Sequence, residues 1–528
     1  MADVTATVFG KHRPAIPYQP VAKLLAQYAA RHPEKLALVD LDQGTSISYG
    51  VLERAVTDIA GELERRGVAK GSRVLLLADE ILEKLLIWLA CWRIGAVVAP
   101  LNIELNAALI SDLASVVDPA LSLVHKELDG KSLLLDRPFV RFGSYTAPGG
   151  DGDADDDFFR QITSGAGSML AQRNEAADVA AIFCTSGTTS RPKLVVYDHC
   201  AYWLVGLSSL EALGLDENDR TLEYRSFGWN SAQVLSLMPF LQKGLTLHIA
   251  RRFSHSRFFD WVREHAITFS VGVPTVINML LNKPLGYSAA DVPSLRLMTC
   301  STAPLTLEQW VRFEEMYGLT LLAMYGMSEA GWICCNRHYK RKMGTVGLPA
   351  LHQEFDIVDP QGNSCPPETE GEVTVGGPHC ALGYLRDDGS IEYTRGSRLK
   401  SGDLAVRDTE GFVRVTGRSK DLIIRGGVNI APLEIDAVLL KHPEVVDAAA
   451  VGVPDTIYGE EVVCYIVKRP GSGLNENAIA EHCRAALAAP KVPKRVVFVA
   501  ELPKSDRGKV LRDKLKDDWN ARALRSAS

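Results

Sequence analysis

The chain lacks any long apolar run and any excess of basic residues. Its most apolar stretch, residues 85–92, is far shorter than the roughly 20 residues of a membrane-spanning helix, and charged residues flank it. Lysine and arginine number 58 against 64 acidic residues, which gives a net charge of −6. The composition therefore indicates no nucleic-acid partner and no membrane span.

Paired cysteine motifs are also missing. The ten cysteines are mostly scattered and include no CxxC, so neither a zinc site nor a disulfide framework is predicted. A reducing compartment fits this pattern best, and the start of the chain shows no apolar segment of a secretory signal peptide. We expect a cytoplasmic protein whose partners are small molecules, and a homodimer remains possible.

The spacing of apolar residues predicts an α/β fold. Helical spacing over 52–66 precedes a buried strand at 72–78, a helix at 81–94 and a second apolar strand at 95–100. This alternation continues to about residue 340 and is typical of mostly parallel sheets.

The chain of 528 residues is too long for one small core, and its character changes along its length. Residues 355–425 hold short strands between glycine and proline turns, which favours antiparallel pairing. We predict a large N-terminal domain at 1–417, whose β-rich part begins at about 350. A hinge at 418–421 and a small, mobile α+β C-terminal domain at 422–528 complete the prediction.

Residues 184–193 read CTSGTTSRPK, a loop rich in hydroxyl side chains that follows an apolar, strand-like run. Hydroxyls, backbone amides and a glycine can fold around phosphate oxygens. The loop does not fit the Walker A motif, because Pro192 directly precedes Lys193. Taken alone, a phosphate-binding loop and a plain surface turn are equally good interpretations.

Four further motifs follow in order: MYGMSEAG at 324–331, SGDLAVRD at 401–408, GRSKDLIIRGGVNIAPLEID at 417–436 and PKSDRGKVLR at 503–512. With TSGTTSRPK they resemble the adenylate-forming superfamily, which includes acyl-CoA synthetases, luciferases and peptide-synthetase adenylation domains. The resemblance implies that ATP activates a carboxylic acid to an acyl-adenylate with release of pyrophosphate. A thiol, here most simply coenzyme A, then displaces AMP.

By this resemblance the hydroxyl-rich loop grips the β- and γ-phosphates of ATP, and Thr188 takes part in catalysis. Gly187 lets the backbone approach the phosphates closely, whereas Ser190 stands where the family usually has glycine and should stiffen the loop. The residues predicted to bind are Thr185, Ser186, Gly187, Thr188, Thr189, Ser190 and Lys193.

The resemblance also assigns the metal and the rest of the nucleotide site. Glu329 is the predicted Mg²⁺ ligand, because a carboxylate beside triphosphate oxygens needs a cation between them. As an isolated residue it would instead be interpreted as an acid at a helix N-terminus. Asp403 is expected to accept hydrogen bonds from both ribose hydroxyls, and Arg418 to hold the ribose or the α-phosphate. The remaining nucleotide-binding residues are Tyr325, which would stack on adenine, and Ala303, Pro304, Gly326 and Ser328.

Three predictions concern the C-terminal part. Lys420 resembles the hinge residue about which the C-terminal domain rotates between the two half-reactions. Gly426 and Gly427 are expected to line the passage for CoA, with a plain β-turn as the alternative. Lys509 is predicted to be catalytic and to bridge carboxylate and phosphate oxygens during adenylation, for which its compact ammonium is suited.

The acyl pocket is expected between three segments, 225–233, 271–276 and 301–304. Trp229 is a candidate gate, although a packing role is equally compatible, and Thr302 replaces a common glycine and narrows the slot. No acidic or amide anchor for an amino group stands out, so we expect an uncharged aromatic or medium-chain aliphatic acid. The predicted pocket residues are Trp229, Gly272, Val273, Ser301, Thr302, Gly326 and Met327.

The favoured function is therefore an AMP-forming acid–CoA ligase with ATP, Mg²⁺ and coenzyme A. One alternative is a stand-alone adenylating enzyme that loads a carrier protein. A silent homologue that serves as a binding protein is a second alternative, against which the intact Lys509, Glu329, Asp403 and Arg418 argue.

Overall fold

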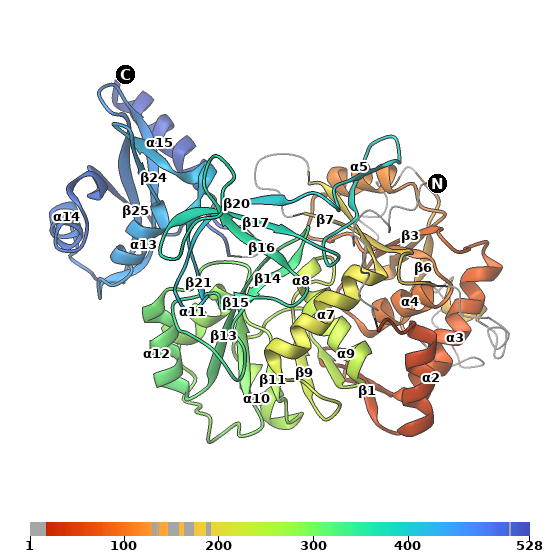
Figure 1. Cartoon of the computed structure of the whole chain (residues 1–528). Helices are drawn as coiled ribbons and strands as arrows, with labels where there is room; N and C mark the ends of the chain where they lie inside the picture. The colour runs from red at the N-terminus through yellow and green to blue at the C-terminus, as the bar shows by residue number, and fades with distance from the viewer. Residues whose placement is uncertain are drawn as a thin grey trace.

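The computed structural model describes residues 17–128, 135, 137–145, 158–162, 174–185, 192–505 and 508–527. It is a mixed α/β structure with a large N-terminal domain and a small C-terminal domain, as the sequence predicts. The small domain stands at one end of the large one (Figure 1).

The first large sheet has nine strands in the order β15-β14-β13-β12-β11-β9-β10-β1-β2. The inner pairs from β13 to β1 are parallel, whereas β2 at one edge and β14 and β15 at the other pair antiparallel. The strands are β1 (Leu36–Asp40), β2 (Thr45–Ser48), β9 (Arg220–Glu223), β10 (Thr246–Ile249), β11 (Phe269–Ser270), β12 (Leu297–Cys300), β13 (Thr320–Met327), β14 (Gly331–Cys335) and β15 (Leu348–Pro349).

The second large sheet has eight strands in the order β19-β18-β8-β7-β4-β3-β5-β6. The strands predicted at 72–78 and 95–100 are its parallel pair β3 and β4. Strands β7 and β8 pair antiparallel, so the hydroxyl-rich loop connects two neighbouring strands. The strands are β3 (Arg73–Leu77), β4 (Val97–Ala99), β5 (Leu121–His125), β6 (Val140–Phe142), β7 (Val179–Cys184), β8 (Leu194–Asp198), β18 (Gly383–Leu385) and β19 (Ile391–Tyr393).

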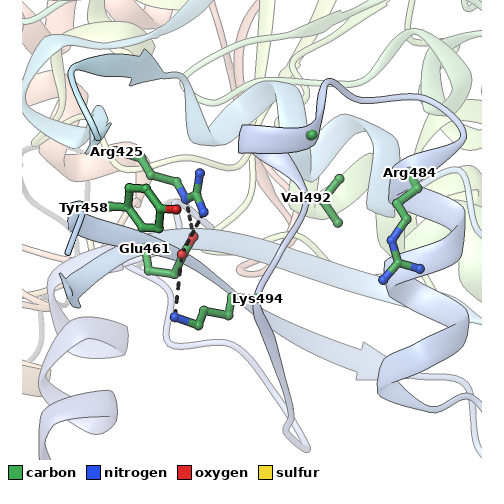
Figure 2. A pocket seen from close by; sticks show the side chains of 7 residues that line it. Arg425, Tyr458, Glu461, Arg484, Val492 and Lys494 are labelled. Atoms are coloured by element: carbon green, nitrogen blue, oxygen red, sulfur yellow. Dashed lines mark hydrogen bonds and ion pairs between the residues drawn. The ribbon is translucent and has the colours of Figure 1, made fainter. Parts of the chain in front are cut away.

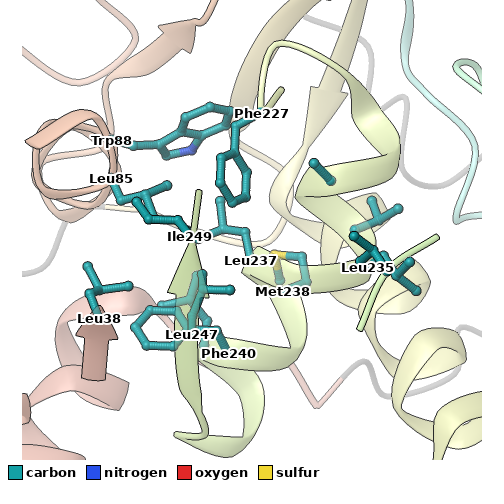
Figure 3. Packing of buried hydrophobic residues seen from close by; sticks show 14 of the residues in the cluster. Leu38, Leu85, Trp88, Phe227, Leu235, Leu237, Met238, Phe240, Leu247 and Ile249 are labelled. Atoms are coloured by element: carbon teal, nitrogen blue, oxygen red, sulfur yellow. The ribbon is translucent and has the colours of Figure 1, made fainter. Parts of the chain in front are cut away.

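Helix α4 is buried along nearly its whole length and contacts strands of both large sheets. Figure 3 shows its Leu85 and Trp88 facing Ile249 and Phe227 within the main hydrophobic cluster. The helices of the large domain are α2 (Val21–Arg31), α3 (Tyr49–Arg65), α4 (Leu82–Arg93), α5 (Ala107–Val117), α7 (His199–Leu213), α8 (Asn230–Ala232), the π-helical η3 (Gln233–Leu237), α9 (Met238–Lys243), α10 (Phe258–Glu264), α11 (Pro274–Asn282) and α12 (Leu307–Tyr317), with the 3₁₀ turns η1 (Lys126–Leu128) and η2 (Phe159–Gln161).

The β-rich part of the large domain is a four-stranded sheet in which every neighbouring pair is antiparallel. This confirms the antiparallel pairing predicted from the short strands and turns of 355–425. The strands are β16 (Glu354–Val358), β17 (Glu370–Gly376), β20 (Leu399–Arg407) and β21 (Val413–Arg418).

The C-terminal domain packs helices on both faces of its own sheet. Successive residues of β24 alternate between two hydrophobic clusters, Ala448 and Ala450 in one and Ala449 and Val451 in the other. The boundaries at 417 and 422 stay a prediction. The elements are η4 (Ser419–Asp421), β22 (Ile423–Arg425), β23 (Val428–Ile430), α13 (Pro432–Leu439), β24 (Val445–Asp455), β25 (Gly459–Lys468), α14 (Glu476–Arg484), η5 (Ala489–Lys491), β26 (Arg495–Phe498) and α15 (Arg512–Ala527).

Candidate active site

Two hydrogen bonds close the base of the hydroxyl-rich loop. The backbone N–H of Thr185 donates to the carbonyl oxygen of Lys193 over 2.8 Å, and the Lys193 N–H donates to the Thr185 hydroxyl over 3.1 Å. Both ends of the loop are thus fixed by the β7–β8 hairpin. The predicted phosphate ligands between them, Ser186, Gly187, Thr188, Thr189 and Ser190, lie outside the described residues.

Lys193 and Glu329 are brought together through a residue that the sequence did not point to. The Lys193 ammonium lies 4.6 Å from the centre of the Tyr384 ring, and the Tyr384 hydroxyl donates a 2.9 Å hydrogen bond to Glu329 Oε1. Burial and the Glu329 charge raise the pKa of Tyr384, so its hydroxyl stays protonated and keeps donating. A cation, a hydroxyl and a carboxylate therefore converge beside the loop.

The surroundings of Glu329 fit a Mg²⁺ ligand. Its Oε1 accepts from Tyr384, whereas its Oε2 has no hydrogen-bond partner among the described residues. Magnesium typically takes one or two protein carboxylates and completes its shell with water and substrate phosphates. Within the described part of the chain no group of three His, Cys, Asp or Glu side chains could hold a metal alone, so Glu329 would act together with the phosphates of ATP. Bound there, Mg²⁺ would neutralise phosphate charge.

Tyr325, Asp403 and Arg418 form a connected group. The Tyr325 hydroxyl donates to Asp403 Oδ2 over 2.7 Å, and Arg418 Nε donates to Oδ1 over 2.6 Å. Asp403 pairs directly opposite Arg418 in the antiparallel β20–β21 ladder, which fixes their separation. A carboxylate has about four acceptor positions, so Asp403 can still accept from a ribose. The stacking of Tyr325 on adenine stays a prediction.

Lys509 reaches this group from the C-terminal domain. Burial and then the positive charge of Arg418 lower the pKa of Lys509 to about 8, while Asp403 and Asp421 act in the opposite direction. The preceding Gly508 is packed so tightly that an added Cβ would lie 1.8 Å from the Thr275 hydroxyl oxygen of α11. The loop that carries Lys509 is thus docked on the large domain.

The three segments of the predicted acyl pocket adjoin one another. The Ser301 N–H donates to the Gly272 carbonyl oxygen over 3.2 Å, and Arg225 Nη1 lies 3.4 Å from the Ser301 hydroxyl. Val273 caps α11 and Gly272 packs against the backbone of Thr299, where a Cβ would come within 2.2 Å.

Trp229 lies in a hydrophobic cluster and is only 6% exposed. That burial is what a packing role requires, and its role as a gate stays a prediction. Of the other pocket and nucleotide residues, Ala303 and Pro304 lie in the turn between β12 and α12, Gly326 and Met327 end β13, and Ser328 follows in the same turn as Glu329.

The glycines predicted to line the CoA passage connect β22 to β23. Both adopt positive φ, +57° at Gly426 and +81° at Gly427, which agrees with a β-turn and leaves the CoA role open. Beside them, a pocket of about 410 Å³ is lined by Arg425, Tyr458, Glu461, Arg484, Ala489, Val492 and Lys494 (Figure 2).

The predicted hinge residue Lys420 is exposed on the short 3₁₀ turn η4. The neighbouring Ser419 hydroxyl donates to the Gly402 carbonyl oxygen over 3.1 Å, and this hydrogen bond ties the turn to β20. A segment of this kind can change its backbone angles at low cost.

Comparison with known proteins places this chain in a family. Residues 25–385 match the model described as AMP-binding enzyme, and residues 434–509 match the AMP-binding enzyme C-terminal domain. Sulfoacetate–CoA ligase from Cupriavidus necator is 31% identical over 514 residues, covering 94% of this chain and 97% of that protein. Feruloyl-CoA synthase from an Amycolatopsis species is 31% identical over 484 residues, covering 90% and 94%.

Solved structures of CoA ligases also resemble this chain over nearly its whole length. ATP-bound MatB from Rhodopseudomonas palustris matches with a TM-score of 0.85 at 26% identity, covering 94% of this chain and 99% of that one. O-succinylbenzoate coenzyme A synthetase from Bacillus subtilis, in complex with ATP and a magnesium ion, matches with a TM-score of 0.80 at 26% identity, covering 94% and 99%.

The chain belongs to the AMP-binding enzyme family. It is an AMP-forming carboxylate–CoA ligase, which uses ATP and Mg²⁺ to form an acyl-adenylate and then transfers the acyl group to CoA. None of the helices in the described part of the chain could span a membrane.

Proposed function

We propose that the acid activated by this ligase has an uncharged body, aromatic or medium-chain aliphatic. The ion pair between Arg225 and Glu223 carries the proposal. Arg225 Nε donates to Glu223 Oε1 over 2.9 Å and Nη2 to Oε2 over 2.7 Å, while the Glu223 side chain is fully buried. The cation beside Ser301 is thus already neutralised, and a second anionic group on the acid would have to compete with a buried carboxylate.

The names of the two relatives point to different substrates. One is named for sulfoacetate, a short acid with a second charge, and the other for ferulate, an aromatic acid. The neutralised guanidinium supports the second class for this chain.

A panel of acids tests this proposal. Pyrophosphate release with MgATP is measured for benzoate- and cinnamate-type acids, for C6 to C10 fatty acids, and for sulfoacetate and oxalate, and the CoA thioester is identified by mass spectrometry. We expect turnover in the first two groups. A preference for either doubly charged acid would overturn the proposed class.

A matched variant sharpens the panel. Glu223→Gln removes the neutralising charge and leaves the Arg225 cation in place, so activity on sulfoacetate and oxalate should rise relative to uncharged acids. An unchanged order of acids in this variant would show that Arg225 does not face the acid.

The residue roles follow from the need to join two anions. We propose that Lys509, Arg418 and a Mg²⁺ ion at Glu329 offset the repulsion between the carboxylate and the α-phosphate. Asp403 would hold the ribose, and the loop between Thr185 and Lys193 the outer phosphates. The proximity of Lys509 to Arg418 and Asp403 supports an adenylating arrangement.

For the second half-reaction we propose rotation about Lys420, which would bring Gly426 and Gly427 to the acyl-adenylate. The adjoining pocket holds three cations, Arg425, Arg484 and Lys494, and Figure 2 shows the first and the last of them paired with Glu461. Such a surface suits the phosphates of free CoA. Mass spectrometry with CoA and with a carrier protein as acceptors separates this from carrier loading, and a carrier-only product would refute it.

Two further proposals concern the cellular compartment and the oligomeric state of the protein: the cytoplasm and a homodimer. All ten cysteines lie in the described part of the chain and are free and buried, which supports the reducing environment of the cytoplasm. Light scattering of the purified protein would test the homodimer, and a monomer at working concentration would exclude it.

A further inference from the structure

Thr302 has a backbone conformation that its side chain disfavours. Its φ is +74°, in the left-handed region. Among the described residues, five that are not glycine have positive φ, and Thr302 is the β-branched one, for which this region is a genuine outlier. Conformations of this kind cost on the order of 1–3 kcal/mol and persist only where the surroundings enforce them.

The surroundings do enforce it. The preceding Ser301 is held by the Gly272 carbonyl oxygen, and the Gly272 N–H in turn donates to the Thr299 hydroxyl over 3.2 Å. Four residues after Thr302, the Thr306 side chain and Gln309 form a capping box that fixes the start of α12. Residue 302 therefore lies between two fixed points, and glycine would fit there without strain.

No hydrogen bond to the described protein compensates for this strain at the Thr302 side chain. Its Oγ1 is buried and has no hydrogen-bond partner among the residues that the structure describes. A buried hydroxyl without a partner costs roughly 1–3 kcal/mol, so strain and desolvation both act against this side chain. A ligand that accepts a hydrogen bond from Oγ1 would offset both.

We propose that Thr302 is a substrate-positioning residue whose hydroxyl donates a hydrogen bond to the carboxylate of the acid. This rests on the proposed acyl pocket, in which the Arg225 guanidinium lies beside Ser301, the residue that precedes Thr302. The chemistry is that of a short, charge-assisted hydrogen bond from a neutral donor to a carboxylate, which holds one oxygen while the other attacks phosphorus. No proton is transferred.

Three variants test the proposal in the full-length chain with MgATP and the best acid of the panel. Thr302→Ser keeps the hydroxyl and should stay within about threefold of wild type in kcat/KM for the acid. Thr302→Val and Thr302→Gly lack the hydroxyl that would donate to the charged carboxylate. Their kcat/KM for the acid should therefore fall on the order of tenfold to a hundredfold, with KM for ATP unchanged.

The thermal stability of Thr302→Gly should increase, whereas its kcat/KM for the acid should decrease. Thr302→Gly removes the strain and should raise the thermal unfolding midpoint by about 1–3 °C although the enzyme becomes slower. Glu368→Gly is the matched control, since it also replaces a non-glycine residue at positive φ, +62°, on an exposed turn. It should leave the kinetics of the acid unchanged.

Two results would overturn the inference. One is a Thr302→Gly or Thr302→Val enzyme with wild-type kcat/KM for the acid, which would leave the hydroxyl without a substrate role. The other is a Thr302→Gly protein that is no more stable than wild type, which would remove the strain argument. This stability test does not depend on whether any acid in the panel is turned over. Failure of the whole panel with the wild-type enzyme would instead refute the proposed acid class.

Discussion

The lowered pKa of Lys509 predicts an alkaline limit on adenylation. Only the ammonium form can stabilise carboxylate and phosphate oxygens, and burial together with Arg418 lowers the pKa of this group to about 8. A group with that pKa is roughly 90% protonated at pH 7 and roughly 10% at pH 9, whereas an ordinary lysine would remain charged at both. The kcat/KM for adenylation should therefore fall about tenfold between pH 7 and pH 9.

Pyrophosphate release at limiting acid is the suitable assay, because kcat/KM reports the ionisation of the free enzyme. Lys509→Arg keeps its charge throughout this range, so its lower rate should be flat to pH 9. Lys514→Arg, an exposed residue of α15, is the control and should reproduce the wild-type decline. A flat wild-type profile, or an equal decline in Lys509→Arg, would refute the reasoning.

The remaining predictions concern single roles. Lys509→Ala should raise the adenylation barrier by about 3–4 kcal/mol and leave thioester formation from supplied acyl-adenylate largely intact; equal losses would contradict its assignment to the first step. Glu329→Gln should raise the Mg²⁺ concentration for half-maximal pyrophosphate release about tenfold or more, since an amide carries no charge, and an unchanged titration would exclude it as a ligand. Asp403→Asn should raise KM for ATP roughly tenfold to a hundredfold without affecting KM for CoA; an effect on CoA alone would argue against ribose binding. Lys420→Pro should slow thioester formation more than adenylation, and an unaffected CoA step would remove its hinge role.

Local sequence determined much of the scaffold. The helical spacing at 52–66 became α3, the apolar runs at 72–78 and 95–100 became β3 and β4, and the turn-rich strands of 355–425 paired antiparallel. These features depend on periodicity and turn chemistry, which are written into short windows of sequence. The ordered motifs likewise sufficed to identify the adenylate-forming chemistry.

The sequence could not indicate what depends on distant partners. Tyr384 meets Glu329 across 55 residues, Tyr325 meets Asp403 across 78, and Lys509 acquires its low pKa from burial against another domain. The positive φ of Thr302 is imposed by its neighbours, because the 271–276 segment and the start of α12 hold the chain on either side of it.

The order of its motifs thus decided the chemical class of this chain, because an ordered set of short motifs is legible in the sequence itself. Charge balance, protonation and backbone strain at the site were decided only by the tertiary structure, since each is a property of groups that folding brings together.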